Sequence, residues 1–334
     1  ILDREKTNHF KEWDDTKKLI NIYGIAAAMS YLHSHNILHH DLKPQNISID
    51  ENLYPKINGF NLSEEIETKE IKCKSKIKGT PAYLPPETYL NCEYNKSSEV
   101  YSYSLIIYEI LTNETPYEDI HSINELIEKI TKKNERPKIK MPIPKIYREL
   151  IERCWSPNPD IRPTFSELVS TLRDNPSFIT ESINEDEYRR YIKYIDEFPI
   201  TFNSNQKIPH LEELVKSRID KITEVDPEFN FKGLYSTEKN NLSFNNTFIN
   251  ISKFEIGNLI NEDNNFKYFE AISKDTQQKY IIRMLSNTYK NFYKHEIAEY
   301  IKELNILLQV SHQSIIKLIG YSPVDFSKQF VGKS

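Results

Sequence analysis

The sequence predicts a mixed α+β protein, with a mainly helical first part, a polar linker and a β-rich part near the C-terminus. From Trp13 to about residue 175, apolar residues recur at three- and four-residue spacing, which is typical of helices packed on a core. From Ile251 onward, short β-branched and aromatic segments are separated by turn residues, which is typical of strands. A third observation is the polar segment 37–46, whose spacing of Asp, Lys and Asn predicts a reaction centre.

The helices of the first part follow in order. Asp14 or Asp15 caps a first helix that runs to about His35, whose terminal histidines are expected to be solvated or to face the helix dipole. A hairpin over 47–63 follows, and the apolar stretch 98–111 predicts a core helix. Further helices are expected near 121–133 and 144–154.

The remaining chain contains two short amphipathic segments and a strand-rich region. Residues 186–195 and 211–219 predict short helices, the first packed on the preceding helical part, and a Ser/Asn/Thr-rich linker covers 235–248. Strands are then expected over 252–257, 266–273 and 278–285, with a helix at about 293–310.

Composition limits the possible functions. The chain has 334 residues, enough for two or three domains, and 38% of them are hydrophobic. A net charge of −5 and a pI near 6.1 give no nucleic-acid footprint, and no run of about 18 apolar residues predicts a membrane span. Three scattered cysteines without metal-ligand spacing predict reduced thiols in a cytoplasmic protein (Cys73, Cys92 and Cys154).

The segment 37–46, with the sequence ILHHDLKPQN, has the spacing of a phosphate-transfer loop. Asp41 and Asn46, five residues apart on a loop restrained by Pro44, can face one reaction centre. Asp41 is the candidate catalytic base, Asn46 is the candidate metal ligand, and Lys43 can neutralise charge on a moving phosphoryl group. The alternative without function is a solvated loop that carries these residues by chance.

This segment closely resembles the catalytic loop H-R-D-x-x-x-x-N of protein kinases, with His40 in place of the arginine. Lys43 is the residue type found there in serine/threonine kinases. Residues 79–87 resemble the element that seats the substrate peptide, with Thr80 placed to accompany Lys43. The resemblance further implies a buried ion pair between Glu87 and Arg162.

The resemblance implies a protein-kinase-like fold of the tyrosine-kinase-like group. Residues 1–175 are expected to form the C-terminal lobe of a first kinase-like domain, and 176–248 a helical region and linker. Residues 249–334 resemble a partial N-terminal lobe of a second domain. The chain is therefore expected to be a piece of a tandem kinase protein whose other lobes are its partners. A circular permutation is disfavoured because the fifth strand and the hinge would be absent.

Several positions of the first lobe depart from the family pattern. Phe60 is retained, but Gly59 replaces the aspartate that binds metal, and losing about 4 kcal/mol of metal stabilisation would slow transfer roughly a thousandfold. Ser48 replaces a leucine beneath the adenine. Glu99 replaces a shorter aspartate that anchors the catalytic loop, which predicts a looser anchor. His40 is expected to grip a phosphorylated loop only when protonated.

The second lobe departs at its nucleotide site. Arg283 stands where the family has the lysine that grips the nucleotide, although the expected partner, Glu303, is present. Gly257 is all that remains of the glycine-rich loop, so backbone amides cannot approach phosphates closely. Tyr268 and Ile281 replace the small residues that cover the adenine in the family pattern. These changes predict weak or absent ATP binding.

Two functions remain open from sequence alone. The first is a pseudokinase that acts as a regulatory scaffold for protein partners. The second is an active serine/threonine kinase that phosphorylates protein substrates with ATP and Mg²⁺. Gly59 and Arg283 favour the first, and Asp41 favours the second.

Overall fold

The computed structural model describes residues 12–66, 77–198, 253–262, 266–285 and 294–318. The expected helix at 211–219, the linker at 235–248 and Cys73 lie outside these residues. The chain divides into two compact units, which we name by their main content. The helical unit comprises residues 1–207 and 302–317, and the sheet unit comprises residues 208–301 and 318–334.

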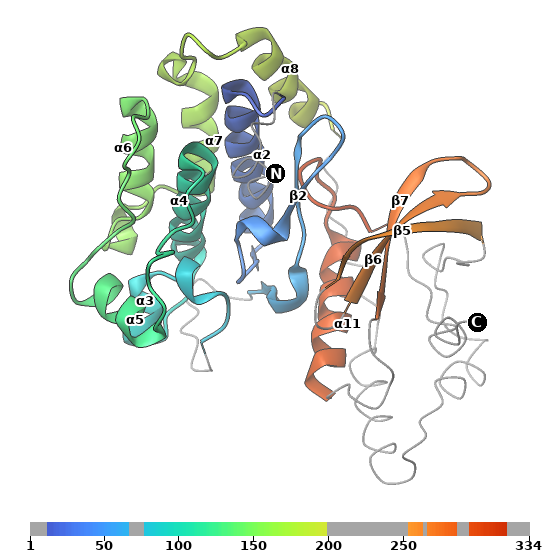
Figure 1. The fold of residues 1–334 in the computed structure, drawn as a ribbon, viewed down its shortest axis with the longest axis horizontal. Helices are drawn as coiled ribbons and strands as arrows, with labels where there is room; N and C mark the ends of the chain where they lie inside the picture. Colours follow the sequence, from blue (N-terminus) through green and yellow to red (C-terminus); the bar gives the residue numbers. More distant parts are fainter. Residues whose placement is uncertain (1–11, 67–76, 199–252, 263–265, 286–293, 319–334) are drawn as a thin grey trace. The chain divides into compact units, whose positions relative to one another are not determined.

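The helical unit is built around two helices that lie side by side, α2 and α4 (Figure 1). Both are buried along most of their length, as expected for core helices. Helix α7 packs on α2, and α6 packs on α4. The helices of this unit are α2 (Asp15–Ser34), α3 (Pro86–Asn91), α4 (Lys96–Thr112), α5 (Ile123–Thr131), α6 (Lys145–Cys154), α7 (Phe165–Asp174) and α8 (Glu185–Asp196).

The ends of these helices follow from local chemistry. Asp14 caps α2 by accepting the Lys17 amide at 2.8 Å, which confirms one of the two expected caps. Asn95 and Ser98 form a capping box at the start of α4. That helix ends at Thr112 and is followed by Asn113 in a left-handed conformation with φ of 60°.

Four short strands position the catalytic loop within the helical unit. Strands β2 (Ile47–Ile49) and β3 (Pro55–Ile57) form the expected antiparallel hairpin after the loop. Strands β1 (Ile37–Leu38) and β4 (Glu64–Glu65) pair antiparallel before and after it. The two pairings fix the chain on either side of the loop.

The sheet unit contains one three-stranded antiparallel sheet in the order β5-β6-β7. Its strands are β5 (Phe254–Glu262), β6 (Phe266–Ser273) and β7 (Lys279–Leu285), close to the predicted ranges. The register shifts between Ile256 and Asn261, so β5 is irregular opposite β6. Helix α11 (Lys294–Gln309) follows, and its residues from Lys302 onward belong to the helical unit.

These elements confirm the mixed α+β class and the strand and helix order along the chain. None of the described helices combines the length and apolar character needed to cross a bilayer. The domain boundaries at 175 and 248 stay a prediction. The grouping of 302–317 with the first helices was not expected from the sequence.

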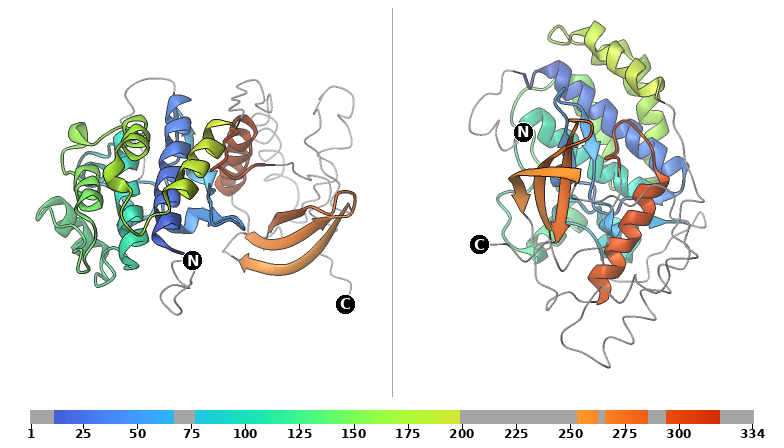
Figure 2. Two further views of the ribbon diagram at one scale, coloured as in Figure 1. Left: turned by 90° about the horizontal axis from the view of Figure 1, so that it is seen from above. Right: turned by 90° about the vertical axis from the view of Figure 1, so that its right-hand side faces the viewer.

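Helix α8 packs on α2, as Figure 2 also shows, and confirms the expectation for residues 186–195. The Tyr188 and Tyr191 rings meet the Tyr23 ring edge-on, with centroids 5.8 and 6.3 Å apart. Asn184 caps α8 by accepting the Glu187 amide at 3.1 Å. The helix is therefore an integral part of the helical unit.

Gly24 makes this close packing possible. A Cβ atom at this position would overlap the Tyr191 hydroxyl and the Pro55 ring. Gly24→Ala should therefore destabilise the protein by about 1–3 kcal/mol, because α8 and the hairpin must both shift. Urea denaturation followed by circular dichroism measures this loss. Gly257→Ala is the control, since its added Cβ would meet only ordinary contacts of 3.5 Å or more. Equal stability of Gly24→Ala and wild type would contradict the prediction.

Candidate active site

Asp41 lies at the centre of a compact hydrogen-bonded group. Its Oδ1 accepts the Thr80 hydroxyl at 2.7 Å, and its Oδ2 lies 2.8 Å from the Lys43 ammonium. Lys43 also donates to the Thr80 hydroxyl at 2.7 Å. The structure thus brings together the three residues that the sequence analysis placed at the reaction centre and the substrate seat.

The charge state of Asp41 follows from these contacts. Burial acts to raise the pKa of the carboxyl, but hydrogen bonds from Lys43 and Thr80 outweigh it, so the pKa lies below its usual value. Asp41 is therefore ionised at neutral pH, as a group that orients a substrate hydroxyl must be. Its basicity is lowered by the same contacts.

Asn46 is tied to Asp41 rather than open to solvent. Its amide nitrogen donates to the Asp41 carbonyl at 2.8 Å and to Oδ2 at 2.9 Å. Gly59 lies directly beside this amide in a left-handed conformation with φ of 78°. A Cβ atom on Gly59 would lie 2.5 Å from Cγ and Oδ1 of Asn46. The Asn46 side chain thus fills the space that a side chain at position 59 needs.

The residues around this loop do not fit a magnesium ion. Mg²⁺ in kinase-type sites takes an octahedral set of oxygens that includes one or two carboxylates. Both Asp41 oxygens already bind cationic or polar donors, and Asn46 brings only an amide oxygen. Asn58 donates its amide nitrogen to the Ser48 hydroxyl at 2.7 Å, and Asn61 is exposed. In the described part of the chain, no group of three or more His, Cys, Asp or Glu side chains is arranged to hold a metal.

His39 fixes the catalytic loop to the neighbouring loop that carries Gly59. Burial lowers the pKa of its imidazole, so the ring is neutral at pH 7. Its Nε2 lies 2.8 Å from the Asn58 carbonyl, and its Nδ1 accepts the Asp41 amide at 3.3 Å. These partners require the proton on Nε2. Phe60, fully buried, packs edge-on against the same ring at 4.9 Å.

Glu99 anchors the catalytic loop from helix α4. Its Oε1 accepts the His40 amide at 2.7 Å, and its Oε2 lies 2.7 Å from His33 Nε2. The expected loosening of the anchor is therefore wrong, because the longer side chain reaches both partners. His33, expected to be solvated or to face the helix dipole, lies in the last turn of α2 and is buried against Glu99. Burial acts to raise the pKa of Glu99, but the His33 hydrogen bond outweighs it and the pKa is lowered.

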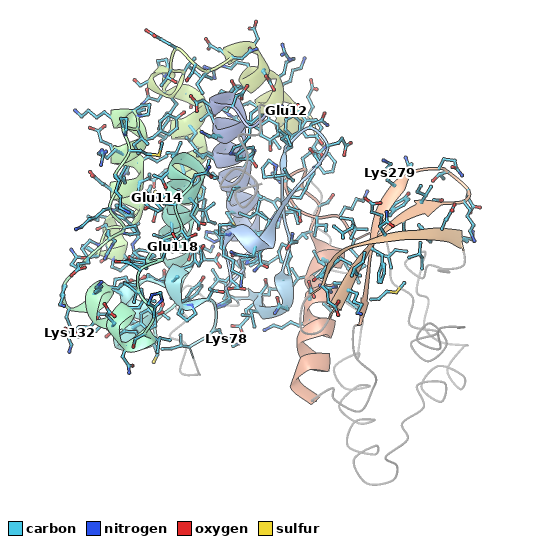
Figure 3. The ribbon with its side chains drawn as sticks, in the orientation of Figure 1. Glu12, Lys78, Glu114, Glu118, Lys132 and Lys279 are labelled. Atoms are coloured by element: carbon cyan, nitrogen blue, oxygen red, sulfur yellow. The ribbon has the colours of Figure 1, made fainter. Side chains whose placement is uncertain are left out.

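The His40 side chain is not accessible to bind a phosphorylated loop. Its ring is 1% exposed and stacks on Tyr94 at 4.4 Å, and its backbone is left-handed with φ of 67°. Its Nε2 lies 3.6 Å from Glu64 Oε2, within ion-pair distance. Glu64 also binds Lys78, labelled in Figure 3, at 2.6 Å and Lys302 at 3.1 Å. The sequence analysis missed Glu64, because its three partners lie far from it along the chain.

The Glu87–Arg162 ion pair is present as expected. Two guanidinium nitrogens donate to the two carboxylate oxygens at 2.7 and 2.9 Å, which is the bidentate geometry of a strong pair. Ser98 donates to Glu87 at 3.2 Å, and the Arg162 Nε donates to the Ser156 carbonyl at 2.9 Å. Both charged groups are buried. The pair ties the substrate-seat segment to α4 and the chain before α7.

The predicted nucleotide-site residues lie on both units. Ser48 belongs to the helical unit on β2, and Glu303 is buried in the same unit. The others lie on the sheet, where Tyr268 pairs with Arg283 across β6 and β7 and Glu270 pairs with Ile281. Ile281 is 56% exposed. Gly257 lies on β5 against Glu270. Their joint role in nucleotide binding stays a prediction.

A family model described as protein tyrosine and serine/threonine kinase matches residues 5–172, half of the chain. The chain belongs to this kinase family. Among curated relatives, the dual specificity protein kinase shkC of Dictyostelium discoideum is 38% identical over 150 residues, covering 44% of this chain and 30% of the relative. The dual specificity protein kinase shkD of the same organism is 36% identical over 194 residues, or 58% of this chain and 25% of the relative.

A third relative is a probable LIM domain-containing serine/threonine-protein kinase of D. discoideum. It is 34% identical over 161 residues, or 48% of this chain and 24% of the relative. This kinase-family chain therefore spans about a quarter to a third of the length of the relatives that it matches. An active member of the family implies ATP, Mg²⁺ and protein substrates.

Breaking the Glu87–Arg162 pair should strongly destabilise the helical unit. Arg162→Met leaves a buried carboxylate without its partner and should cost about 3–5 kcal/mol of unfolding free energy. Chemical denaturation measures this. Arg189→Met is the control, because its pair with Glu185 is exposed and worth less than about 1 kcal/mol. A loss of stability as small as that of the control would contradict the assigned burial.

Glu64 should make the stability of the folded protein fall at acidic pH. His40, followed by Lys78 and Lys302, holds the pKa of this carboxyl far below its usual range. A depressed pKa adds stability above the unfolded value of about 4.3, and that stability is lost as pH falls toward the folded value. Glu64→Gln should therefore lower the melting temperature at pH 7 and flatten its decline below about pH 4. Glu51→Gln, at an exposed turn, should leave the profile unchanged, and an unchanged profile for Glu64→Gln would contradict the prediction.

Proposed function

We propose that this protein is a regulatory or scaffolding pseudokinase that binds protein partners without phosphoryl transfer. One observation carries the proposal. Gly59 replaces the metal-binding aspartate, and the Asn46 side chain fills the space beside it. A site that lacks this carboxylate loses the electrostatic stabilisation on which phosphoryl transfer depends.

The lobe assignment belongs to the same proposal. Residues 1–175 act as the C-terminal lobe of one kinase-like domain, and the strands from 254 to 285 act as part of an N-terminal lobe. Arg283 on β7 supports loss of nucleotide binding in that lobe, because a planar guanidinium does not replace a compact ammonium. The fold then provides a surface that binds protein partners, and it does not act as a catalyst.

A second candidate function is favoured by the Asp41 group. Asp41, Lys43 and Thr80 are assembled at hydrogen-bond distances, as a serine/threonine kinase requires to orient a substrate hydroxyl. Relatives named as dual specificity and serine/threonine kinases support this alternative. In that case, Asp41 is the base and Lys43 neutralises the phosphoryl group.

Calorimetric titration of the full chain with ATP, with and without Mg²⁺, tests the proposal. A pseudokinase of this kind should show no tightening of ATP binding by magnesium, because no carboxylate at position 59 completes the metal site. A tightening of tenfold or more would overturn the proposal.

Phosphate transfer to a generic protein substrate separates the two functions. The pseudokinase predicts no transfer by wild type, by Asp41→Asn or by the exposed control Asp160→Asn. The kinase predicts transfer by wild type and by the control, with a fall of about 10²–10⁴-fold in Asp41→Asn.

A further inference from the structure

The helical unit carries two segments of opposite charge around α5. Residues 113–128, the acidic segment, contain five Asp and Glu residues and no Lys or Arg. Residues 132–145, the basic segment, contain six Lys and Arg residues and a single Glu. The two segments therefore have equal and opposite formal charge, in a chain whose net charge is −5.

The two segments lie beside each other in the fold. The Tyr108 hydroxyl of α4 lies 2.8 Å from Glu114 Oε2 and 3.3 Å from the Lys138 carbonyl, so it contacts both segments. Glu114, Glu118 and Lys132, labelled in Figure 3, lie on the side of the helical unit that carries α5 and α6. One surface thus presents both charges next to each other.

This surface is only partly neutralised by its own ion pairs. Each of the pairs lies at the surface, where such contacts contribute little to stability. The pairs that involve the acidic segment are Lys140–Glu114 at 3.8 Å, Lys133–Glu128 at 3.6 Å and Lys129–Glu125 at 3.2 Å. The charged side chains of the two segments that form no ion pair with another described residue include Glu118, Lys132 and Lys138. Charge therefore remains available to a partner on both halves of the surface.

Each segment also exposes a large apolar side chain. Ile123, at the start of α5, is 52% exposed, and Met141 of the basic segment is 42% exposed. Pro142 and Pro144 restrict the backbone after Met141, and Pro144 has φ of −54° and ψ of 140°. Apolar side chains on a restricted backbone lose little freedom on binding and are typical of the centre of a protein interface.

The charge pattern fits a second copy of this chain. A uniformly anionic partner, such as an acidic lipid surface, would attract the basic segment and repel the acidic segment beside it. A two-fold axis between the segments would instead place the acidic segment of each copy opposite the basic segment of the other. A surface with equal and opposite halves is in this way complementary to itself.

We propose that residues 113–145 form the interface of a symmetric homodimer, in which the acidic segment of each copy faces the basic segment of its partner. Ile123 and Met141 supply the apolar contacts. The charges are exposed, so the association is weak and falls with ionic strength. The dimer does not depend on whether the chain transfers phosphate.

Light scattering of the full chain over a range of concentrations tests the dimer. The mass should approach twice 39.5 kDa at about 100 µM and return to 39.5 kDa on dilution. Raising the salt from about 0.05 to about 0.5 M should weaken association by about tenfold or more. A mass of 39.5 kDa at every concentration would overturn the proposal. Masses beyond the dimer would show an open chain of copies and would overturn the two-fold arrangement.

Two charge-reversed variants test which segments meet. Glu118→Lys with Asp119→Lys reverses the acidic segment, and Lys132→Glu with Lys138→Glu reverses the basic one. All four side chains are exposed, so the fold should be retained, which circular dichroism checks. Each variant alone should dimerise at least about tenfold more weakly than wild type, because segments of like charge then face each other.

Mixing the two variants distinguishes the proposed contact from a general effect of charge. In the mixed dimer, each reversed segment meets a segment of opposite charge at both contacts. Association should therefore return to within about threefold of the wild-type value. A mixture that associates as weakly as either variant alone would mean that the two segments do not face each other.

Arg190→Glu with Lys193→Glu is the matched control, because it reverses two exposed charges on α8, outside the proposed interface. This variant should dimerise like wild type, and it should not restore association when mixed with the variant of the acidic segment. If it weakens the dimer as much as the variant of the basic segment, the interface is not formed by residues 113–145.

Discussion

The buried carboxylate of Glu99 holds the catalytic loop in place. Glu99 has no exposed surface, yet it stays ionised because His33 and the His40 amide both donate to it. A buried charge without such partners would cost several kcal/mol. Helix α4, the end of α2 and the catalytic loop therefore depend on one another through this side chain.

The loop that this anchor supports is fully ordered by its own hydrogen bonds, although Gly59 beside it replaces the aspartate of the family pattern. Asp41, Lys43 and Thr80 share a closed set of hydrogen bonds, so their positions do not require a bound ligand. Asn46 completes the set from inside the loop. The hydrogen bonds that order the loop are therefore independent of a carboxylate at position 59.

The sequence predicts local features of this fold well and distant partnerships poorly. Periodicity located α2 and α4, and the resemblance to protein kinases implied the Glu87–Arg162 pair. The contacts of Glu64 with His40, Lys78 and Lys302 could not be predicted from the sequence, because these residues come together only when the chain is folded. The grouping of residues 302–317 with the helical unit escaped prediction for the same reason.

Errors arose where side-chain length was judged without backbone geometry. An extra methylene in Glu99 suggested a looser anchor, but the reach of a carboxylate matters only relative to the amide that it meets. His33 looked like a helix-end residue by position, although the end of α2 is buried by α4 and α7. Neither fact is contained in the spacing of residues along the chain.

Gly59 has a consequence for how this site could change over time. An aspartate there would need a left-handed backbone, which costs an L-residue about 1–2 kcal/mol, and would meet the Asn46 amide at 2.5 Å. Asn46 can turn away only by giving up its hydrogen bonds to Asp41. A carboxylate at position 59 thus requires coordinated changes at two positions, so a single Gly59→Asp substitution would not by itself give the arrangement of the family pattern.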